Sequence, residues 1–534
     1  RLTPEPVSSA DSEDPEIVEP NNHGHAVKID AHKKVGAPRW TGPQSAESAE
    51  LENHQKNNSY ETADYSELPR GRRLVNFTWA YKIKRSGKLK ARLCVQGCSQ
   101  VPGVDYDQAY CAAMRQSSLR LLSSSAARLN LAMNRWDFVS AYLQGELLDD
   151  EVIYCRTPPG VRPTLGKDGR ERIYVVKKPI YGMVQAGRRW QRTLFPYLQK
   201  GGPGWKFTQC FADPCIFTCR HRIQLPNGES REEVLIVGVY VDDLFVLSSH
   251  RDEHSLYAKF TESLSRDWDV EDEGPVNDLL SVQISRDSTG HVLLRQTAYI
   301  EKMVKAHFVQ GVCPPRHKNR TPCDSGDDGL KAHSDAATDA VAGREPGTPP
   351  DIESNLLRQY QSLVGGLLYC AMNTRPDIAY SCGILTRNMS CPTPELLLDA
   401  HRVLAYLYHN REIGLRYAPV SDDLTGYSDS DWGVKRSTSG SVFIYGQAAI
   451  SWSSNKQTSV ALSSCEAEIM AASEAAKDAL YLQRFLTELE LSTPEQMASL
   501  AVDNTAAIDL AYNPQHHKRS KHIERRHFFI RECV

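Results

Sequence analysis

The strongest chemical signal in the sequence is a pair of adjacent acids, Asp242 and Asp243, inside the segment VLIVGVYVDDLFVLSS at residues 234–249. Apolar, β-rich runs flank the pair, which predicts two strands joined by a tight turn. Aspartates favour turns for purely structural reasons. Two like charges in so apolar a setting are nevertheless costly unless a cation neutralises them, so the segment indicates a metal site.

A third carboxylate that could complete this site is Asp137, which ends the apolar run LAMNRWD at residues 131–137. Taken alone, Asp137 is more simply explained as a helix cap. Together with the acid pair it offers the oxygen ligands that magnesium prefers, with room left for waters and substrate phosphates. Two such ions about 4 Å apart activate a hydroxyl and stabilise the leaving oxygen in phosphoryl transfer.

A second set of spaced acids lies near the end of the sequence. Asp429 follows GYS, Glu468 lies in SSCEAE, and Asp503 ends the run SLAVD. A serine three residues before Glu466 gives the spacing of a capping box, so Glu466 has a structural role and Glu468 is freer to bind a metal. Asp503 could instead cap the helix expected over residues 505–512.

The elements that must position these acids change in character along the chain. Residues 1–66 are expected to form a disordered lead-in, because their polar composition buries too little apolar surface to offset chain entropy. The polar residues 315–352 are expected to form a linker or a long surface loop. Residues 353–420 are expected to be helical. Residues 421–534 are expected to form three strands, a long helix, a strand, a short helix and a basic tail.

Composition indicates a globular chain with several cores: 534 residues, 40% apolar and 24% charged, with a formal net charge of -3. The net charge excludes no partner, because local patches set nucleic-acid affinity, and residues 70–92 carry a dense basic run. The cysteines are scattered without zinc-finger spacing, which favours buried thiols. No apolar run of about 18 residues occurs, so no membrane partner is expected.

From Leu68 onward the sequence contains a series of specific motifs, in chain order LPRGRRLVNFTWAYKIK, KARLCVQG, RWDFVSAYLQGELLDDEVIYCRTPPG, KKPIYGMVQAGRRW, FADPCIF, VYVDDLFV, SLVGGLLYCAMNTRPDIAYS and GYSDSDW. Through these motifs the sequence resembles the Pol polyproteins of copia-type LTR retrotransposons. YVDD between apolar strands is similar to the catalytic hairpin of reverse transcriptases. The resemblance implies an α/β and α+β multidomain fold, in which a right-hand polymerase precedes a helical connection and an RNase H-like domain.

The resemblance also implies domain limits and activity. It implies fingers and palm over residues 67–250, a thumb-like region over 251–314, the connection over 353–420 and the RNase H-like domain over 421–534. The implied activity is that of an RNA-directed DNA polymerase (a nucleotidyltransferase) with a ribonuclease H that degrades the RNA of an RNA–DNA hybrid. The implied cofactors are Mg²⁺ or Mn²⁺, two ions in each active site. The polymerase ligands would be Asp137, Asp242 and Asp243.

Four further residues match positions that bind the nucleotide in the family. Tyr142 resembles the aromatic steric gate, whose ring would crowd a ribose 2′-OH and favour deoxynucleotides. Gln185 in YGMVQAG resembles the glutamine that lines the nucleotide pocket, where its amide would contact the 3′-OH. Lys90 and Arg92 resemble the cations that bind the triphosphate, with either one as the match. Tyr142 could instead be a core residue, and the two cations a solvated basic face.

For the ribonuclease, the resemblance implies that the metal ligands are the second set of acids, Asp429, Glu468 and Asp503. Asp431 is an alternative to Asp429. In the tail HHKRSKHIERRHFFIRE, Glu524 takes the place of the family's last acidic position, with His522 as an alternative. The surrounding Lys and Arg residues could bind the backbone of the hybrid, although a charge run is usually a solvated face.

The resemblance implies as partners an RNA template, a DNA primer, the RNA–DNA hybrid and dNTPs. Protease, integrase and Gag domains are expected to lie upstream and to be missing from this chain. The expected location is the cytoplasm, in virus-like particles, or the nucleus.

Three departures from the family pattern occur: Ser281 replaces a glycine, YCAAMR at residues 110–115 replaces an FSPVVR-like motif, and Gly187 stands where many relatives have proline. None removes a catalytic acid. The alternative function is that of a catalytically decayed or host-retained remnant that binds nucleic acid.

Overall fold

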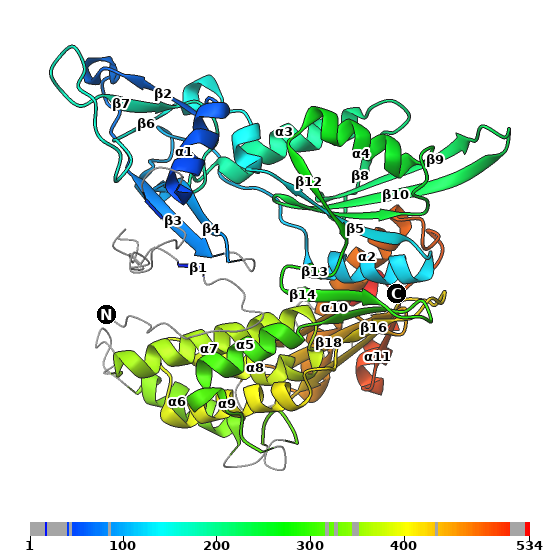
Figure 1. Ribbon diagram of the computed structural model, residues 1–534. Coiled ribbons are helices and arrows are strands. Elements are labelled where there is room, and N and C mark those ends of the chain that lie inside the picture. The colour runs from blue at the N-terminus through cyan, green and yellow to red at the C-terminus, as the bar shows by residue number, and fades with distance from the viewer. Residues whose placement is uncertain are drawn as a thin grey trace.

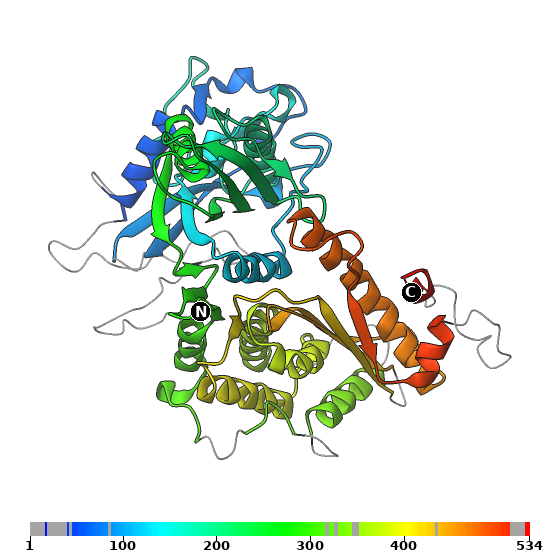
Figure 2. The same cartoon turned by 90° about the vertical axis from the view of Figure 1, so that its right-hand side faces the viewer.

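The computed structural model describes residues 17–18, 40–41, 45–83, 87–315, 320–324, 329–343, 352–432, 436–512 and 529–533. Figure 1 shows an upper and a lower lobe, with helix α2 (Gln116–Arg128) at their junction. The turned view in Figure 2 shows the same placement of α2 between the two lobes. In the described part of the chain, no helix combines the length and apolarity that crossing a membrane requires.

The upper lobe is centred on a six-stranded sheet with the strand order β12-β5-β11-β10-β9-β8. Its strands are β5 (Ala132–Phe138), β8 (Thr208–Gln209), β9 (Ile216–Gln224), β10 (Ser230–Tyr240), β11 (Asp243–Ser248) and β12 (Val270–Pro275). Helices α3 (Ala186–Lys200) and α4 (Leu256–Asp267) share one core with Leu244 and Val246, whereas α2 shares another with Phe245 and Leu247. Both faces of β11 are therefore buried, which is why its sequence is a continuous apolar run.

The N-terminal part of the upper lobe holds two small sheets, β1-β3-β4 and β2-β7-β6, and one helix. The elements are β1 (Ile17–Val18), α1 (Ala46–Lys56), β2 (Tyr60–Ala63), β3 (Phe77–Ile83), β4 (Leu89–Val95), β6 (Ile153–Cys155) and β7 (Ile173–Val176). The expectation of disorder through residue 66 is wrong for residues 45–66. Ser45 caps α1, and Glu50 on α1 accepts from the backbone N–H of Leu93 in β4.

The lower lobe combines a four-stranded sheet with a bundle of helices. The strands are β13 (Asp278–Leu279), β14 (Val282–Arg286), β15 (Val292–Arg295) and β16 (Leu415–Tyr417). The helices are α5 (Thr297–His307), α6 (Leu330–Ala342), α7 (Ser354–Asn373), α8 (Ala379–Leu385) and α9 (Pro394–His409). One apolar core joins α5 to α9.

Helix α6 corrects the expectation of a linker over residues 315–352. Its Leu330 and Ala337 are buried in the core of the bundle, although the surrounding sequence is polar. That core also contains Ile300 of α5 and Leu363 of α7, so the expected boundary between a thumb-like region and a connection does not separate two packed units.

The C-terminal sheet has the order β19-β18-β17-β20, in which only β20 runs parallel to its neighbour β17. Its elements are β17 (Thr425–Asp431), β18 (Thr438–Tyr445), β19 (Ala448–Lys456), α10 (Ser464–Glu488), β20 (Ser499–Val502), α11 (Thr505–Tyr512) and α12 (Ile530–Cys533). The expected order of three strands, long helix, strand and short helix is confirmed. The basic tail lies outside the described residues.

The lobes meet through a buried arginine on α2. The Arg120 guanidinium donates to the carbonyl oxygens of Ile450 (2.7 Å), Met372 (2.6 Å) and Asn373 (3.0 Å), and it lies 4.0 Å from the ring centroid of Trp452. One apolar core continues from α2 into β15, β18 and α10. The C-terminal sheet is thus packed against the upper lobe and is not a separate body on a tether.

Candidate functional site

The adjacent acids lie on the predicted hairpin. Strands β10 and β11 pair with Tyr240 opposite Asp243, which leaves Val241 and Asp242 as a two-residue turn. On its other side β11 pairs with β5, and in that pairing Asp243 lies directly opposite Asp137. Asp137, Asp242 and Asp243, together called the hairpin site, therefore meet at one end of the six-stranded sheet.

The turn is held in an uncommon backbone conformation. Val241 has φ +57°, and of the two central residues it alone has a positive φ, as in a type II′ turn, which favours glycine there. A β-branched residue in this region is strained. Trp190 of α3 donates from Nε1 to the Val241 carbonyl at 2.6 Å, and the N–H of Phe138 donates to the Asp242 carbonyl at 3.0 Å. These two bonds fix the turn against β5 and α3.

A basic residue that the sequence analysis did not single out reaches this site. Arg135 precedes Asp137 by two residues, so both side chains lie on the same face of β5. Its Nε and Nη2 lie 3.0 and 2.8 Å from Oδ1 of Asp243, and its Nη1 lies 3.0 Å from Oε2 of Glu273. The sequence did carry a signal for this residue: on a strand, a side chain two positions before Asp137 lies on the same face as Asp137.

The carboxylates of the hairpin site are partly buried and repel one another. Burial and, after it, the charges of Asp242, Asp243 and Glu273 together raise the pKa of Asp137 to about 7, against the opposing effect of Arg135. Burial also raises the pKa of Asp243, where Arg135 again opposes the shift. Excess negative charge of this kind is what a bound cation relieves.

Three of the residues near the hairpin site form a stack. The Arg92 guanidinium lies 4.5 Å from the ring centroid of Tyr181, and the Tyr181 ring lies 4.7 Å from that of Tyr142. Burial raises the pKa of Tyr142 to about 12, with a further contribution from Asp242. These three side chains therefore lead from β4 toward the turn that carries Asp242. Tyr181 was missed by the sequence analysis, although it lies in the quoted motif KKPIYGMVQAG.

Glycine makes this stack possible. The N–H of Val95 donates to the Tyr181 carbonyl at 2.8 Å, so the chain passes against the end of β4. A Cβ on Gly182 would lie 2.2 Å from the Val95 carbonyl oxygen, and Gly182 also has φ +86°. No other residue fits this close backbone approach without displacing β4.

Gln185 does not lie in the stack. Its side chain is fully buried, its Oε1 accepts from Gln100 Nε2 at 2.9 Å, and its Nε2 donates to the Asp105 carbonyl at 3.1 Å. In this structure both ends of the amide are taken up by these contacts, and the expectation that it contacts an incoming nucleotide stays a prediction. Lys90 lies two residues from Arg92 on the same face of β4, opposite Lys82.

The second set of acids converges. Carboxylate oxygens of Asp429 on β17, Glu468 on α10 and Asp503 after β20 all lie within 4.8 Å of one another. Together these residues are called the acid cluster. Ser430 holds Glu468 Oε1 through its N–H (3.1 Å) and its hydroxyl (2.9 Å). Burial raises the pKa of Glu468, and Asp429 and Asp503 add to the shift.

The structure also decides between neighbouring acids. Glu466 receives the N–H of Leu462 at 2.7 Å and belongs to the cap of α10. Asp431 pairs with Lys331 of α6 at 2.5 Å and is not one of the converging residues. The cap of α11 is Asn504, whose side chain accepts from Ala507 N–H at 3.0 Å, so Asp503 is free of that role. Glu524 and His522 lie outside the described residues.

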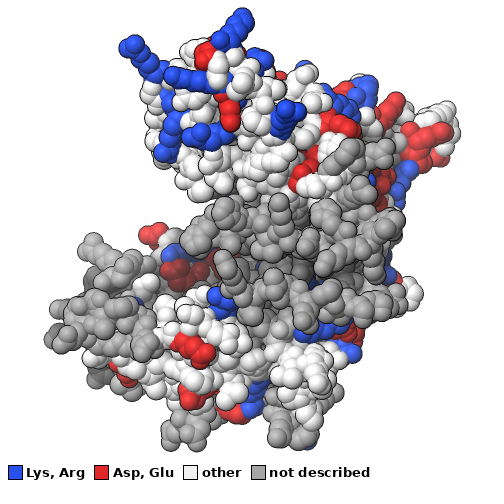
Figure 3. Space-filling view, turned by 60° about the vertical axis from the view of Figure 1, so that its left-hand side comes forward, with Lys and Arg blue, Asp and Glu red and all other residues white. Residues whose placement is uncertain are grey.

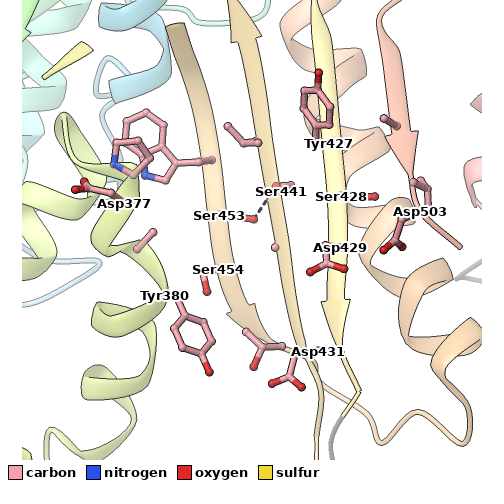
Figure 4. Close-up of a pocket in the computed structure, with 18 residues that line it drawn as sticks. Asp377, Tyr380, Tyr427, Ser428, Asp429, Asp431, Ser441, Ser453, Ser454 and Asp503 are labelled. Atoms are coloured by element: carbon pink, nitrogen blue, oxygen red, sulfur yellow. Dashed lines mark hydrogen bonds between the residues drawn. The ribbon is translucent and has the colours of Figure 1, made fainter. Parts of the chain in front are cut away.

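The acid cluster opens into a pocket of about 800 Å³ between the C-terminal sheet and α8. Figure 4 shows Asp429 on β17 and Asp503 just past the end of the neighbouring strand β20, with Tyr380 of α8 on the other side of the pocket. Half-exposed Tyr427 lies two residues before Asp429 on the same strand face. The pocket thus combines clustered carboxylates with accessible aromatic rings.

Comparison with known proteins connects this geometry to a family. Residues 60–314 match the family described as reverse transcriptase (RNA-dependent DNA polymerase). The chain is 32% identical over 496 residues to the retrovirus-related Pol polyprotein from transposon TNT 1-94 of Nicotiana tabacum, covering 91% of this chain and 34% of that protein. It is 29% identical over 471 residues to the Pol polyprotein from transposon RE1 of Arabidopsis thaliana, which covers 86% of this chain and 29% of that protein.

The chain belongs to the Pol polyproteins of copia-type LTR retrotransposons. It spans about a third of the length of the curated relatives named above. Among solved structures, foamy viral protease-reverse transcriptase in complex with double-stranded DNA gives a TM-score of 0.42 at 11% identity, covering 94% of this chain and 70% of that one. The same viral enzyme in complex with RNA/DNA hybrid gives a TM-score of 0.43 at 11% identity, covering 89% of this chain and 56% of that one.

Proposed function

We propose that the chain is an RNA-directed DNA polymerase that also cleaves the RNA strand of an RNA–DNA hybrid. The observation that carries this proposal is the strand register that sets Asp137 opposite Asp243, beside Asp242 in the turn. The family match over residues 60–314 supports the polymerase. The convergence of the acid cluster supports the ribonuclease.

In the polymerase, the six-stranded sheet would be the palm, the N-terminal sheets the fingers, and β13–β15 with α5 part of the thumb. Figure 3 shows Lys and Arg side chains gathered on the upper lobe, where they suit a nucleic-acid backbone or a triphosphate. Arg92 would bind the triphosphate through its fork of donors. Tyr142 would exclude a ribose 2′-OH, and Tyr181 would hold the other two side chains in place by stacking.

The donor set of the hairpin site fits a hard divalent cation such as Mg²⁺. Asp137 and Asp242 offer carboxylate oxygens, and neither is bound in an ion pair among the described residues. A bound cation would supply activation of the primer hydroxyl and charge stabilisation at the leaving oxygen. The residues of this chain would position the primer end and the nucleotide, which is how most of the rate enhancement in phosphoryl transfer arises.

The acid cluster fits such a cation more closely. Oε2 of Glu468 is buried and has no hydrogen-bond partner among the described residues, which is costly for a carboxylate oxygen unless a ligand completes it. Asp429, Glu468 and Asp503 would hold the ion. The hybrid would enter the pocket between the C-terminal sheet and α8, where Tyr380 and Tyr427 offer rings to its sugars or bases.

The test uses two substrates and two matched variants. Wild-type protein should extend oligo(dT) on poly(rA) with dTTP and should cleave the RNA of a preformed hybrid, both with Mg²⁺ or Mn²⁺. Asp242→Asn should lose extension and keep cleavage, whereas Asp429→Asn should do the reverse. Equal loss of both activities in a folded variant would contradict two separate sites. Binding of the hybrid with neither activity in either metal would identify a non-catalytic remnant.

A further inference from the structure

A positively charged side chain, Arg135, lies against the hairpin site and makes specific contacts there. The Arg135 guanidinium directs two nitrogens to one oxygen of Asp243, and a third nitrogen to Glu273 and to the Asp278 carbonyl (3.3 Å). The side chains of Arg135 and Asp243 are only 26% and 15% exposed. An ion pair this well enclosed is screened much less by water and salt than a surface pair.

The position of Arg135 allows no simple withdrawal from the site. Its backbone lies on β5 between β11 and β12, opposite Phe245 on one side and Gly274 on the other. Glu273 lies at the irregularity in β12 and holds the far end of the guanidinium. Three neighbouring strands therefore fix the positive charge over Asp243, two residues along the same strand from Asp137.

The acid cluster has no such cation. Among the described residues, no Lys or Arg forms an ion pair with Asp429, Glu468 or Asp503, and Glu468 Oε2 has no partner. Lys331 of α6 is paired with Asp431, which is not a member of the acid cluster. The two carboxylate sites of one chain therefore differ in one respect that bears on cations: an arginine is paired with one acid of the hairpin site, whereas no described Lys or Arg is paired with an acid of the acid cluster.

We propose that Arg135 weakens the intrinsic divalent-cation affinity of the hairpin site, because its fixed charge repels a cation and occupies Oδ1 of Asp243, which leaves only Oδ2 of that carboxylate beside Asp137 and Asp242. This inference rests on the proposed function of the hairpin site as a metal-dependent polymerase centre. Its consequence is that the site is filled together with the nucleotide, whose phosphate oxygens supply negative charge and the ligand that Oδ1 of Asp243 withholds. The acid cluster takes up a cation without such help.

The inference is tested by titrating Mn²⁺ into the full chain and following free Mn²⁺ by electron paramagnetic resonance, without nucleotide or nucleic acid. A Glu468→Gln background removes the acid cluster from the measurement. In that background Arg135→Gln should raise the Mn²⁺ affinity on the order of tenfold or more, the scale at which groups that contact metal ligands act. Adding Asp242→Asn to Arg135→Gln should abolish the gain and thereby locate it.

The matched control is Arg231→Gln, which removes an arginine that pairs with Glu233 and Asp252 away from the hairpin site. It should leave Mn²⁺ binding unchanged. If a folded Arg135→Gln variant binds Mn²⁺ as wild type does, or more weakly, the inference is wrong. If Arg135→Gln does not fold, Arg135→Lys decides, because it keeps the charge but loses the two-nitrogen contact: a smaller gain supports the inference and no gain overturns it.

Failure of this inference is distinguishable from failure of the proposed function. Primer extension by wild-type protein, together with unchanged Mn²⁺ affinity in Arg135→Gln, would reject the role of Arg135 and keep the polymerase. An increased affinity in Arg135→Gln, in a protein that extends no primer, would keep the role of Arg135 as a counter-charge and reject the polymerase.

Discussion

The hairpin site and the acid cluster are both built from three carboxylates that a β-sheet helps to bring together, yet their surroundings differ. The acid cluster draws its members from β17, α10 and the end of β20, and its oxygens converge within 4.8 Å. The hairpin site occupies a strained turn and has one acid paired with Arg135. The difference teaches that converging acids alone do not define how a site binds cations, because the nearest fixed positive charge matters as much.

The largest effect that tests this comparison is on catalysis. Asp137→Asn should reduce primer extension by about 10²–10³-fold, because the variant keeps the shape of the side chain and loses its charge. Glu468→Gln should reduce hybrid cleavage on the same scale. Each variant should keep the other activity within a factor of about two, as measured on the two substrates described above. Loss of both activities from either variant would show that the sites are not independent.

The next largest effect concerns the junction between the lobes. Arg120→Met keeps the bulk of the side chain but removes the donor to three carbonyl groups, two of them in buried contacts, so stability should fall by about 3 kcal/mol. Thermal unfolding of wild type and variant measures the change. Arg295→Met, which removes a partly exposed partner of Glu412, is the matched control and should change stability by less than about 0.5 kcal/mol. A small effect of Arg120→Met would mean that the two sites belong to loosely joined units.

A third effect follows from the raised pKa of Asp137. In the folded, metal-free protein this pKa is about 7, above its unfolded value, so the carboxyl destabilises the fold increasingly as the pH rises toward 7. Asp137→Asn does not titrate. Its gain in stability over wild type should therefore grow between pH 5 and pH 8, by about 1 kcal/mol after allowance for solvent screening. Chemical denaturation in chelator at both pH values checks the sign, and a gain that shrinks with pH would contradict it.

The smallest effect concerns turn strain. Val241→Gly should stabilise the protein by about 1 kcal/mol, because glycine adopts a positive φ without the Cβ penalty. It should also lower primer extension by loosening the catalytic turn. Ser281→Gly is the matched control: Leu280 and Ser281 (φ +55° and +57°) form the turn between β13 and β14, away from the catalytic turn. That variant should gain similar stability with unchanged extension. Equal activity losses in both would show that the strain of Val241 has no special role.

The hairpin and the C-terminal element order could be predicted from the sequence because each depends on local patterns. The continuous apolar runs of β10 and β11 indicate buried strands, and the two-residue turn between them then leaves little choice of register. The choice of Glu468 over Glu466 was also local, since the capping box sets the role of Glu466. The Ser281 departure from the family pattern coincides with a positive φ, where glycine would cost less.

Other features depended on contacts that are distant in the sequence. Helices α1 and α6 lie in polar segments with few apolar residues, and they are ordered by packing on β4 and on α8 and α9. Gln185 and Tyr181 lie four residues apart in one motif, and only the close approach at Gly182 decides which of them faces Tyr142. The pairing of Arg135 with Glu273 joins strands that are far apart in the chain, so no local pattern indicates it.

The contacts of Arg120 have one more consequence, for how this junction tolerates mutation. All three of its acceptors are main-chain carbonyls, so substitutions of the side chains at positions 372, 373 and 450 leave the acceptors in place. Substitutions on the far side of the junction therefore need not remove these hydrogen bonds, although Ile450 and Asn373 are themselves buried. All three hydrogen bonds nevertheless depend on one side chain, so a single substitution of Arg120 removes all of them at once.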